Sequence, residues 1–337
     1  MPTESLDLSV VIVSWNVKEY LMKCLSSVNN NVNNLSYEII VIDNNSSDGT
    51  AEMIRKKFPE TKLTINRENF GFARANNQAF AQCRGRYILL INPDTYLIDN
   101  SMNRLIEFLE SHKEVGVVGP MLLNPDKSIQ YICFYFPSLL SELLNSLNLD
   151  NVVRRKLLKK RLAKLMEKGM PFEVDWVPGA CLILRSQILN EIGGLDEKYF
   201  LFSEEMEWCF RIKARGWKVF LIGNVFVIHY GSRSTKQNIH QMLIQRQKSR
   251  HIFFKNHRGL VFRLGIRFIY IFSFMVKILI RIASIPLTVL LPRDSALISN
   301  VGTKDEISIR LKAYFELLLL YLKPSLSDSD FDRYLYT

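Results

Sequence analysis

The amino-acid sequence predicts an α/β fold: a mixed, mainly parallel sheet that is flanked by helices. Apolar and often β-branched runs occur at residues 8–16, 37–44, 62–66 and 86–92. Segments with helical spacing separate these runs, which is the pattern of strands buried on both faces of a sheet. Polar residues end several of the strands, and sheets of this class bind ligands beyond the carboxyl ends of their strands.

The segments between these strands have the spacing of amphipathic helices. Residues 17–30 carry apolar side chains on one side, and a helix over 51–58 follows the turn SSDGT and is closed by Pro59. FARANNQAFAQC is a third helical segment. No GxGxxG follows the first strand and no GxxxxGK[ST] occurs in the chain, so neither a dinucleotide fold nor a P-loop has support.

The second half of the chain begins with a further buried strand. WVPGACLILRS (176–186) combines a tight Pro-Gly entry with a continuous apolar run. A helix over about Glu204–Arg215 ends at Gly216, and VFVIH (225–229) is another strand. The chain then becomes basic and, up to about Leu291, strongly apolar.

The composition limits the possible partners and the compartment. The 337 residues carry a net charge of +11, which predicts an anionic partner such as phosphates, nucleic acid or an anionic membrane surface. The N-terminus lacks the pattern of a signal peptide, so we expect a cytosolic protein. The five cysteines form no CxxC pair and are expected to be buried thiols in a reducing compartment: Cys24, Cys83, Cys133, Cys181 and Cys209.

Three polar side chains, Asn16, Asp43 and Asp94, follow separate predicted strands. One alone would be an ordinary strand end, but three at one edge of a sheet indicate a site. Carboxylates in a basic protein that binds an anion need a cation between them, and Mg²⁺ or Mn²⁺ fits this role, with Asp94 as its strongest candidate ligand. His229 ends the strand VFVIH. It either adds an imidazole, which suits Mn²⁺ better than Mg²⁺, or bonds to backbone.

Three glutamates open the helix that follows the loop GGLDEKYFLFS. Acidic residues in the first turn of a helix complement its dipole. This role accounts for the presence of one or two of the three residues, Glu204, Glu205 and Glu207, but not for all of them. Their neighbours are largely aromatic and apolar, and a carboxylate in such surroundings has a raised proton affinity and makes a usable general base. Glu204 and Glu207 share a helix face while Glu205 points elsewhere. We expect one of them to be structural and one catalytic.

Seven segments together resemble family 2 glycosyltransferases with the GT-A nucleotide-diphospho-sugar transferase fold, and most of all the bacterial rhamnosyltransferase-type members. They occur in the order of that family and cover residues 8 to about 235. Each segment alone is weak evidence for the family, whereas seven segments in the same order are highly specific for it. The segments are VVIVSWN, VIDNNSSDGT, NFGFARANNQAF, LLINPDT, VPGACLILRS, GGLDEKYFLFSEEMEWCFR and HYGSRS.

The resemblance implies roles for individual residues on the donor side. Asp43 stands where the family binds the nucleotide base, with Ser14, Asn16 and Arg74 nearby. Asp94 occupies the last position of the DxD motif, which carries the metal and the diphosphate.

Three further positions bear on the metal and the chemistry. The first position of the DxD motif is Asn92, so one charged ligand is missing, and His229 matches a position that often completes the site. Glu205 lies where the family places its catalytic base, which is usually an aspartate, and Glu204 remains the alternative. We expect the following residues on the acceptor side or in support: Glu204, Glu207, Trp176 and Gly179.

The implied reaction is an inverting, metal-dependent sugar transfer. The donor would be a nucleotide-diphospho-sugar, a dTDP- or UDP-sugar with rhamnose favoured, and Mn²⁺ or Mg²⁺ would stabilise the leaving diphosphate. The anomeric carbon becomes oxocarbenium-like, as in glycoside hydrolysis. One base deprotonates the acceptor and no covalent intermediate forms. The expected product is part of a cell-surface polysaccharide of the cell wall.

The segment 259–286 is apolar but carries recurrent charges. On a helical wheel its basic residues fall within an arc of roughly 80° at ~100° per residue. Such a helix suits a membrane interface with its basic residues reaching lipid phosphates; the alternatives are a core helix or, less favoured, a spanning helix. The arc consists of Arg263, Arg267, Lys277 and Arg281.

A second basic segment, 152–169, is also amphipathic. We therefore expect a GT-A catalytic domain at 1–235 with a basic insertion at about 138–170, and a C-terminal helical, membrane-associated region at 236–337. The predicted protein is peripheral on the cytoplasmic face of the membrane, and its acceptor is a lipid-linked saccharide.

Two other functions compete with this one. An enzyme that transfers sugar directly to polyprenyl phosphate would usually keep both carboxylates of the DxD motif. A catalytically degenerate membrane scaffold or a nucleic-acid binder would also be basic. However, aliphatic residues, not stacking aromatics, separate the basic ones, and no DNA-reading motif is visible, so we expect no nucleic-acid partner.

Overall fold

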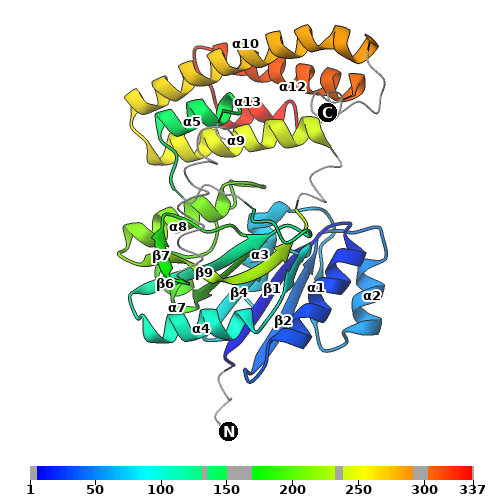
Figure 1. Ribbon diagram of the computed structural model, residues 1–337, viewed down its shortest axis with the longest axis vertical. Helices are drawn as coiled ribbons and strands as arrows, with labels where there is room; N and C mark the ends of the chain where they lie inside the picture. Colours follow the sequence, from blue (N-terminus) through cyan, green and yellow to red (C-terminus); the bar gives the residue numbers. More distant parts are fainter. Residues whose placement is uncertain (1–5, 131–134, 150–168, 232–237, 291–302, 336–337) are drawn as a thin grey trace. The chain divides into compact units, whose positions relative to one another are not determined.

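The computed structural model describes residues 6–130, 135–149, 169–231, 238–290 and 303–335. Contacts within the chain define two compact units. The first comprises Met1–Phe136 and Leu158–Ser234 and contains the sheet, while the second comprises Pro137–Leu157 and Thr235–Thr337 and is helical (Figure 1). Most of the basic segment 152–169 lies outside the described residues.

The first unit is built on one nine-stranded mixed sheet. Strands β3, β2, β1 and β4 run parallel in that order, β8 is antiparallel to β4 and β6, and β9 pairs with β6, β5 and β7. The strands are β1 (Leu8–Ser14), β2 (Tyr37–Asp43), β3 (Lys62–Ile65), β4 (Tyr87–Ile91), β5 (Thr95–Leu97), β6 (Val115–Leu123), β7 (Pro171–Val174), β8 (Cys181–Arg185) and β9 (Lys218–His229).

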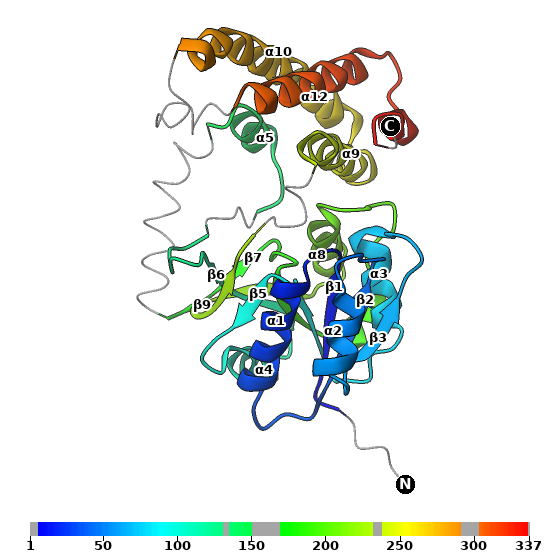
Figure 2. The same ribbon diagram turned by 90° about the vertical axis from the view of Figure 1, so that its right-hand side faces the viewer.

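Helices cover both faces of this sheet (Figure 2). One apolar core packs α1, α2 and α4 against it, and a second packs α3, α7 and α8 against the other face. The central strands are therefore apolar on both sides, as their continuous apolar sequences predict. The helices are α1 (Lys18–Asn31), α2 (Thr50–Lys57), α3 (Gly71–Phe80), α4 (Ser101–Ser111), α7 (Gln187–Ile192) and α8 (Glu204–Ala214).

The strand order determines where a ligand binds. The chain builds β1, β2 and β3 outward on one side and then returns to place β4 on the other side of β1. Ligands of open α/β sheets bind beyond the carboxyl ends of the strands at such a reversal. Residues that follow β1 and β4, including Asn16 and Asp94, therefore lie at this point. The strand predicted from residue 176 begins at Cys181, and the residues before it lead into the sheet.

The second unit is a group of helices in which α5 packs against α10. The Tyr270 hydroxyl donates a 2.6 Å hydrogen bond to the buried carboxylate of Glu142, and Arg250 lies 3.5 Å from the same carboxylate. The helices are α5 (Leu139–Ser146), α9 (Ile239–His257), α10 (Leu260–Leu290), α12 (Lys304–Leu322) and α13 (Asp328–Asp332).

Helix α10 has two unlike faces. Its inward face carries the buried residues Ile266, Tyr270, Phe274 and Ile278. By length and composition the stretch Leu260–Pro286 could cross a membrane, and 28% of its most apolar part is buried. Its other face exposes a row of large apolar side chains at helical spacing: Val261, Leu264, Phe268, Phe272, Met275, Leu279 and Ile282.

Candidate active site

Asp43 lies at the carboxyl end of β2, beside Ser14 at the end of β1. Ser46 holds its carboxylate through a 2.5 Å bond from the hydroxyl and a 3.3 Å bond from the backbone N–H. Burial raises the pKa of Asp43, while these bonds from Ser46 act in the opposite direction. Among the described residues, the buried Ser14 hydroxyl has no hydrogen-bond partner. The carboxylate is thus fixed and largely desolvated, beside an unused hydroxyl.

Asn16 follows β1 in a left-handed conformation, with φ of 51°. Its backbone N–H donates to the Ser46 hydroxyl at 2.9 Å, and its Oδ1 accepts from the Ser47 N–H at 2.8 Å. Asparagine tolerates this conformation better than most residues. The loop after β1 and the loop after β2 are therefore tied together, and Asn16 belongs to the same cluster as Asp43.

Asp94 and His229 face one another at the end of the sheet. Nε2 of His229 lies 3.4 Å from Oδ1 of Asp94, and the backbone N–H of Tyr230 donates to the Asp94 carbonyl at 2.9 Å. The antiparallel pairing of β5 and β9, which sets Thr95 opposite His229, creates this approach. Only 7% of Asp94 is exposed, so the pair is shielded from bulk water.

Gln130 orients the imidazole of His229. Its amide nitrogen donates to the His229 carbonyl at 2.5 Å, which leaves its Oε1 to accept from Nδ1 of the ring at 2.9 Å. With the proton on Nδ1, the lone pair of Nε2 is directed at Asp94. A polar partner that fixes the tautomer in this way is typical of metal-ligating histidines.

One carboxylate and one oriented imidazole form the oxygen and nitrogen donor set expected for Mn²⁺. Two acceptor atoms 3.4 Å apart with no proton between them repel each other, so a cation or a proton on the ring stabilises the arrangement. Within the described ranges, no group of three or more His, Cys, Asp or Glu side chains could hold a metal. Among the described residues of this edge, Asp94 and His229 are the two that could hold a metal together.

The loop before α8 is docked on the start of α3. The backbone N–H of Phe72 donates to the Phe200 carbonyl at 2.7 Å, and the Asn44 side chain donates to the Gly71 carbonyl at 3.0 Å. Gly71 has φ of +77°, and a Cβ there would lie 2.6 Å from Cδ2 of Phe200. Only glycine permits this close approach, which links the loop after β2 to the loop that leads into α8.

Two consecutive residues before α8 have unusual backbone angles. Phe202 and Ser203 have φ of 71° and 67°, a region that costs a residue with a side chain of order 1 kcal/mol or more. This turn starts α8 at Glu204, which is 4% exposed. Burial, and then the charge of Glu205, raise the pKa of Glu204 well above its usual value. Glu204 Oε2 has no hydrogen-bond partner among the described residues.

Glu205 is more exposed than Glu204 and lies against the turn that precedes β8. A Cβ on Gly179 would lie 3.7 Å from Cβ of Glu205 and 3.5 Å from the Phe72 ring. The next residue, Ala180, accepts a 3.0 Å hydrogen bond from the backbone N–H of Asn92. One short turn thus contacts both the residue that begins the DxD-like segment and the start of α8.

Glu207 has a different environment from its two neighbours. Arg211 donates to both of its carboxylate oxygens at 2.9 and 3.0 Å. The same guanidinium also donates to the carbonyls of Ile192 and Gly194. Both carboxylate oxygens of Glu207 therefore bind Arg211, and this pair holds the loop before α8 against the helix.

The remaining predicted residues lie at the margins of this cluster. Arg74 is exposed near the start of α3, with its guanidinium 4.0 Å from the Phe70 ring centroid. Trp176 donates from its indole N–H to the Tyr135 carbonyl at 3.3 Å and packs against the core. The interactions that the described residues make connect neither of them to Asp94, and neither is paired with Glu205 through the bonds given above. The sequence did not point to Gln130 or Ser46, because neither belongs to a chemical motif by itself.

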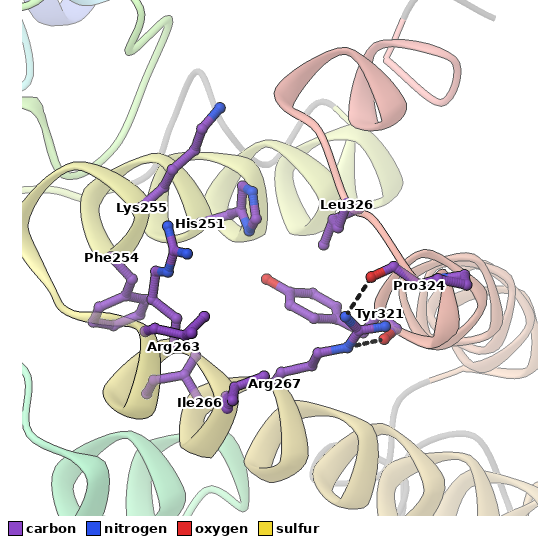
Figure 3. Close-up of a pocket in the computed structure, with 11 residues that line it drawn as sticks. His251, Phe254, Lys255, Arg263, Ile266, Arg267, Tyr321, Pro324 and Leu326 are labelled. Atoms are coloured by element: carbon purple, nitrogen blue, oxygen red, sulfur yellow. Dashed lines mark hydrogen bonds between the residues drawn. The ribbon is translucent and has the colours of Figure 1, made fainter.

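The second unit contains a separate cavity of about 290 Å³ (Figure 3). Arg267 lies in its wall and donates to the carbonyls of Tyr321, Lys323 and Pro324 at the end of α12. Lys255, also in its wall, pairs with Asp328 at 2.9 Å. The charged groups of Arg267 and Lys255 are thus already bonded to other groups of the protein.

The sheet and its strand order are those of the GT-A fold. A solved mannosyltransferase from Pyrobaculum calidifontis, in complex with GDP-Man and Mn²⁺, superposes with a TM-score of 0.53 at 14% identity. The match covers 94% of this chain and 87% of that one, and it confirms the predicted fold class.

The sequence comparisons specify the family. The model of glycosyl transferase family 2 matches residues 9–168. An N-acetylglucosaminyl-diphospho-decaprenol L-rhamnosyltransferase of Mycobacterium tuberculosis is 25% identical over 75% of this chain and 85% of its own length. Rhamnosyltransferase WbbL of Escherichia coli K12 is 24% identical over 67% of this chain and 84% of its own length. The chain thus contains a family 2 glycosyltransferase domain and is similar to rhamnosyltransferases, as its seven segments predicted.

Proposed function

We propose that this enzyme transfers a sugar, with rhamnose favoured, from a nucleotide-diphospho-sugar to a lipid-linked saccharide, with inversion at the anomeric carbon. The observation that carries the proposal is the Asp94–His229 pair at the same sheet edge as Asp43. The names of both rhamnosyltransferases that it resembles support the sugar, and the name of the Mycobacterium tuberculosis enzyme supports the lipid-linked acceptor.

The donor lies across the ends of β1, β2 and β4 in this proposal. The carboxylate of Asp43 accepts from the nucleotide base, because its burial and the bonds from Ser46 fix its direction. Asp94 and His229 face the diphosphate. A divalent cation held by these two residues, Mn²⁺ or Mg²⁺, would neutralise charge on the departing diphosphate. Gln130 keeps the imidazole of His229 in the tautomer that can bind a cation.

Glu205 takes the proton from the acceptor hydroxyl. Its neighbour Glu204 is buried, and burial raises the pKa of Glu204 and favours its protonated form, so we assign the role of base to Glu205. The turn at Gly179 supports Glu205 from one side, while the Glu207–Arg211 pair anchors the helix from the other. Since no covalent intermediate forms, one base is sufficient for an inverting reaction.

The second unit places the enzyme on the membrane. The exposed row on α10 lies in the interface, together with the exposed Phe315, Leu319 and Leu322 of α12. The helix does not cross the bilayer in this proposal, because Arg267 and Lys277 on its other face contact α12. A surface on the cytoplasmic leaflet would bring the sugar nucleotide and the lipid acceptor together.

Thermal unfolding of the full chain tests the donor assignment. dTDP-, UDP- and GDP-sugars are each added with and without Mn²⁺, and we expect one of them to raise the melting temperature in the presence of the metal. The selected donor is then tested for transfer to N-acetylglucosaminyl-diphospho-polyprenol and to polyprenyl phosphate. No stabilisation by any sugar nucleotide, or transfer to polyprenyl phosphate alone, would contradict the proposal.

A further inference from the structure

Lys277 is an unpaired cation on the inward face of α10. It is half-buried and, among the described residues, makes no hydrogen bond and no ion pair. Its ammonium group lies 5.2 Å from the centroid of the Tyr314 ring of α12. A cation–π contact of this kind contributes about 0.5–2 kcal/mol, which does not replace the hydration that a buried ammonium loses.

The pairing of the helices brings arginines to the same place. Helices α10 and α12 run antiparallel, because Arg267 binds the end of α12 at Tyr321 while Lys277 meets Tyr314, further back along α12. One turn further along both helices, Arg281 of α10 therefore falls near Arg310 of α12. Among the described residues, Arg310 makes no side-chain hydrogen bond and no ion pair.

Helix α9 adds a further cation from the third side. Its residue Arg250 meets Glu142, which also binds Tyr270 of α10, so Arg246, one turn earlier on α9, falls near Lys277. The electrostatic contributions agree with this placement, since Lys277 is influenced by the charges of Arg246, Arg281 and Arg310. We call these four residues, Arg246, Lys277, Arg281 and Arg310, the basic cluster.

The positive charges of the basic cluster repel one another. Burial, followed by the three arginine charges, lowers the pKa of Lys277 to about 8. Burial and Arg250 likewise lower the pKa of Arg246. Glu142 is shared by Arg250 and Tyr270. Lys277 and Arg310 have no acidic partner among the described residues, and two such cations beside further positive charges fit an anion that contacts several cations at once.

We infer that the basic cluster binds the phosphate or diphosphate group of a lipid. An amphiphile is favoured over a free phosphate because the same two helices expose the apolar row of α10 and Phe315, Leu319 and Leu322 of α12. The acyl or polyprenyl chain lies along these residues while the head group enters among the cations. The inference rests on the proposed membrane association. It adds a specific binding site for the lipid phosphate to that proposal.

Flotation of the full chain with vesicles tests the site. Phosphatidylcholine vesicles with and without phosphatidic acid are compared for the wild type and for Lys277→Gln and Arg310→Gln. We expect each variant to lose about tenfold or more in affinity for the phosphatidic acid vesicles, as a charge-assisted hydrogen bond to phosphate contributes about 1.5–3 kcal/mol. The matched control is Lys312→Gln, which removes an exposed charge from the same helix.

The control decides between a site and a generally basic surface. A residue that only adds to the surface potential contributes about 1 kcal/mol, which corresponds to about fivefold. Equal losses for Lys277→Gln, Arg310→Gln and Lys312→Gln would therefore overturn the inference. Melting temperatures of the three variants show whether each is folded, and we expect none of them to fall.

A second readout does not depend on a variant. At pH 8 the amine of Lys277 is partly neutral and reacts with an acylating reagent, and mass spectrometry measures the rate at that residue. A bound phosphate raises the proton affinity of the amine and slows this reaction. We expect protection by phosphatidic acid vesicles at concentrations where inorganic pyrophosphate gives little. Equal protection by pyrophosphate would overturn the lipid assignment, and no protection by either would overturn the site.

These outcomes are separable from those of the proposed function. Donor binding is measured on the same variants by thermal stabilisation with the sugar nucleotide, and we expect it to be unchanged. If donor binding and transfer hold while Lys277→Gln floats like the wild type, only the lipid site is wrong. If no sugar nucleotide binds the wild type, the proposed function fails while the flotation result stands by itself.

Discussion

Gln130 and His229 hold each other through two hydrogen bonds, one to the imidazole and one to the backbone carbonyl of the histidine. The consequence is an imidazole whose free nitrogen faces Asp94 at 3.4 Å. No single stretch of sequence contains this arrangement, because its parts come from β9, the loop after β4 and the segment after β6. The three side chains behave as one unit, and substitutions should reveal this.

We expect Gln130→Leu to weaken Mn²⁺ binding by about 10–100-fold, the usual effect of losing a partner that orients a ligating histidine. Asp94→Ala should abolish both metal binding and transfer. Titration of Mn²⁺ by electron paramagnetic resonance measures the affinity directly. Gln130→Glu, which keeps an acceptor for Nδ1, serves as the matched variant. Unchanged Mn²⁺ affinity in Gln130→Leu would show that the amide does not position the ring.

Glu205→Gln should reduce turnover by about 10²–10⁴-fold, the usual contribution of a general base, and leave donor binding intact. Glu204→Gln should retain most of the activity, because burial raises the pKa of Glu204 and the amide copies the protonated form that burial favours. Steady-state kinetics with the native acceptor compare the two variants. The reverse result, normal turnover in Glu205→Gln and loss in Glu204→Gln, would assign the base to Glu204.

Gly71→Ala should lower both the melting temperature and the turnover. The added methyl group meets the carbonyl and ring of Phe200 and forces the loop before α8 to move, so that Glu205 shifts with it. Gly216→Ala is the matched control, since Gly216 has φ of +92° and nothing within 4 Å. It carries the backbone cost of roughly 1 kcal/mol without the clash. Equal effects of the two changes would remove the role assigned to the Gly71–Phe200 contact.

Lys277→Met should stabilise the protein at neutral pH. The pKa of Lys277 is lowered from 10.5 to about 8, so between these values the unfolded chain binds more protons and the free energy of unfolding rises with pH. The groups that face Lys277 are Arg246 on α9, Arg281 on α10 and Arg310 and Tyr314 on α12.

The gain from Lys277→Met should therefore be largest at pH 7 and shrink as the pH rises through 8 toward 10. A change of about 1 kcal/mol shifts the melting temperature of a domain of 150–250 residues by about 2–4 °C. Calorimetry at pH 7 and pH 9.5 measures the difference, with Lys312→Met as the control. A gain that does not depend on pH would show that packing, not charge, is responsible.

Local patterns were sufficient to predict the sheet and the position of three polar side chains at its edge. The apolar runs that end at Ser14 and Asp43 are strands because their side chains are buried on both faces. The ends of parallel strands share one edge, so Asn16, Asp43 and Asp94 could be placed there without coordinates.

The remaining features depend on tertiary structure. Gln130 gave no signal, because an amide becomes a partner of His229 only when β6 and β9 pair. The left-handed backbone at Phe202 and Ser203 could not be predicted from residues that favour other conformations. The helical wheel of residues 259–286 predicted that the basic residues of α10 share one face. It could not show that Arg267 and Lys277 of this face would contact α12.

The second unit is formed by two separate stretches of the chain, and this has a consequence for the synthesis of the protein. Helix α5 belongs to that unit, yet it leaves the ribosome before β7, β8 and β9 of the sheet and long before its partner α10. Folding during translation is therefore ordered: α5 is made before the last strands of the sheet unit, and its Glu142 meets its hydroxyl partner only when Tyr270 has been made. A fragment cut after Arg258 would remove the Tyr270 hydroxyl from that carboxylate and leave Arg250 in place, so shortening the chain at its end also disturbs a segment near its middle.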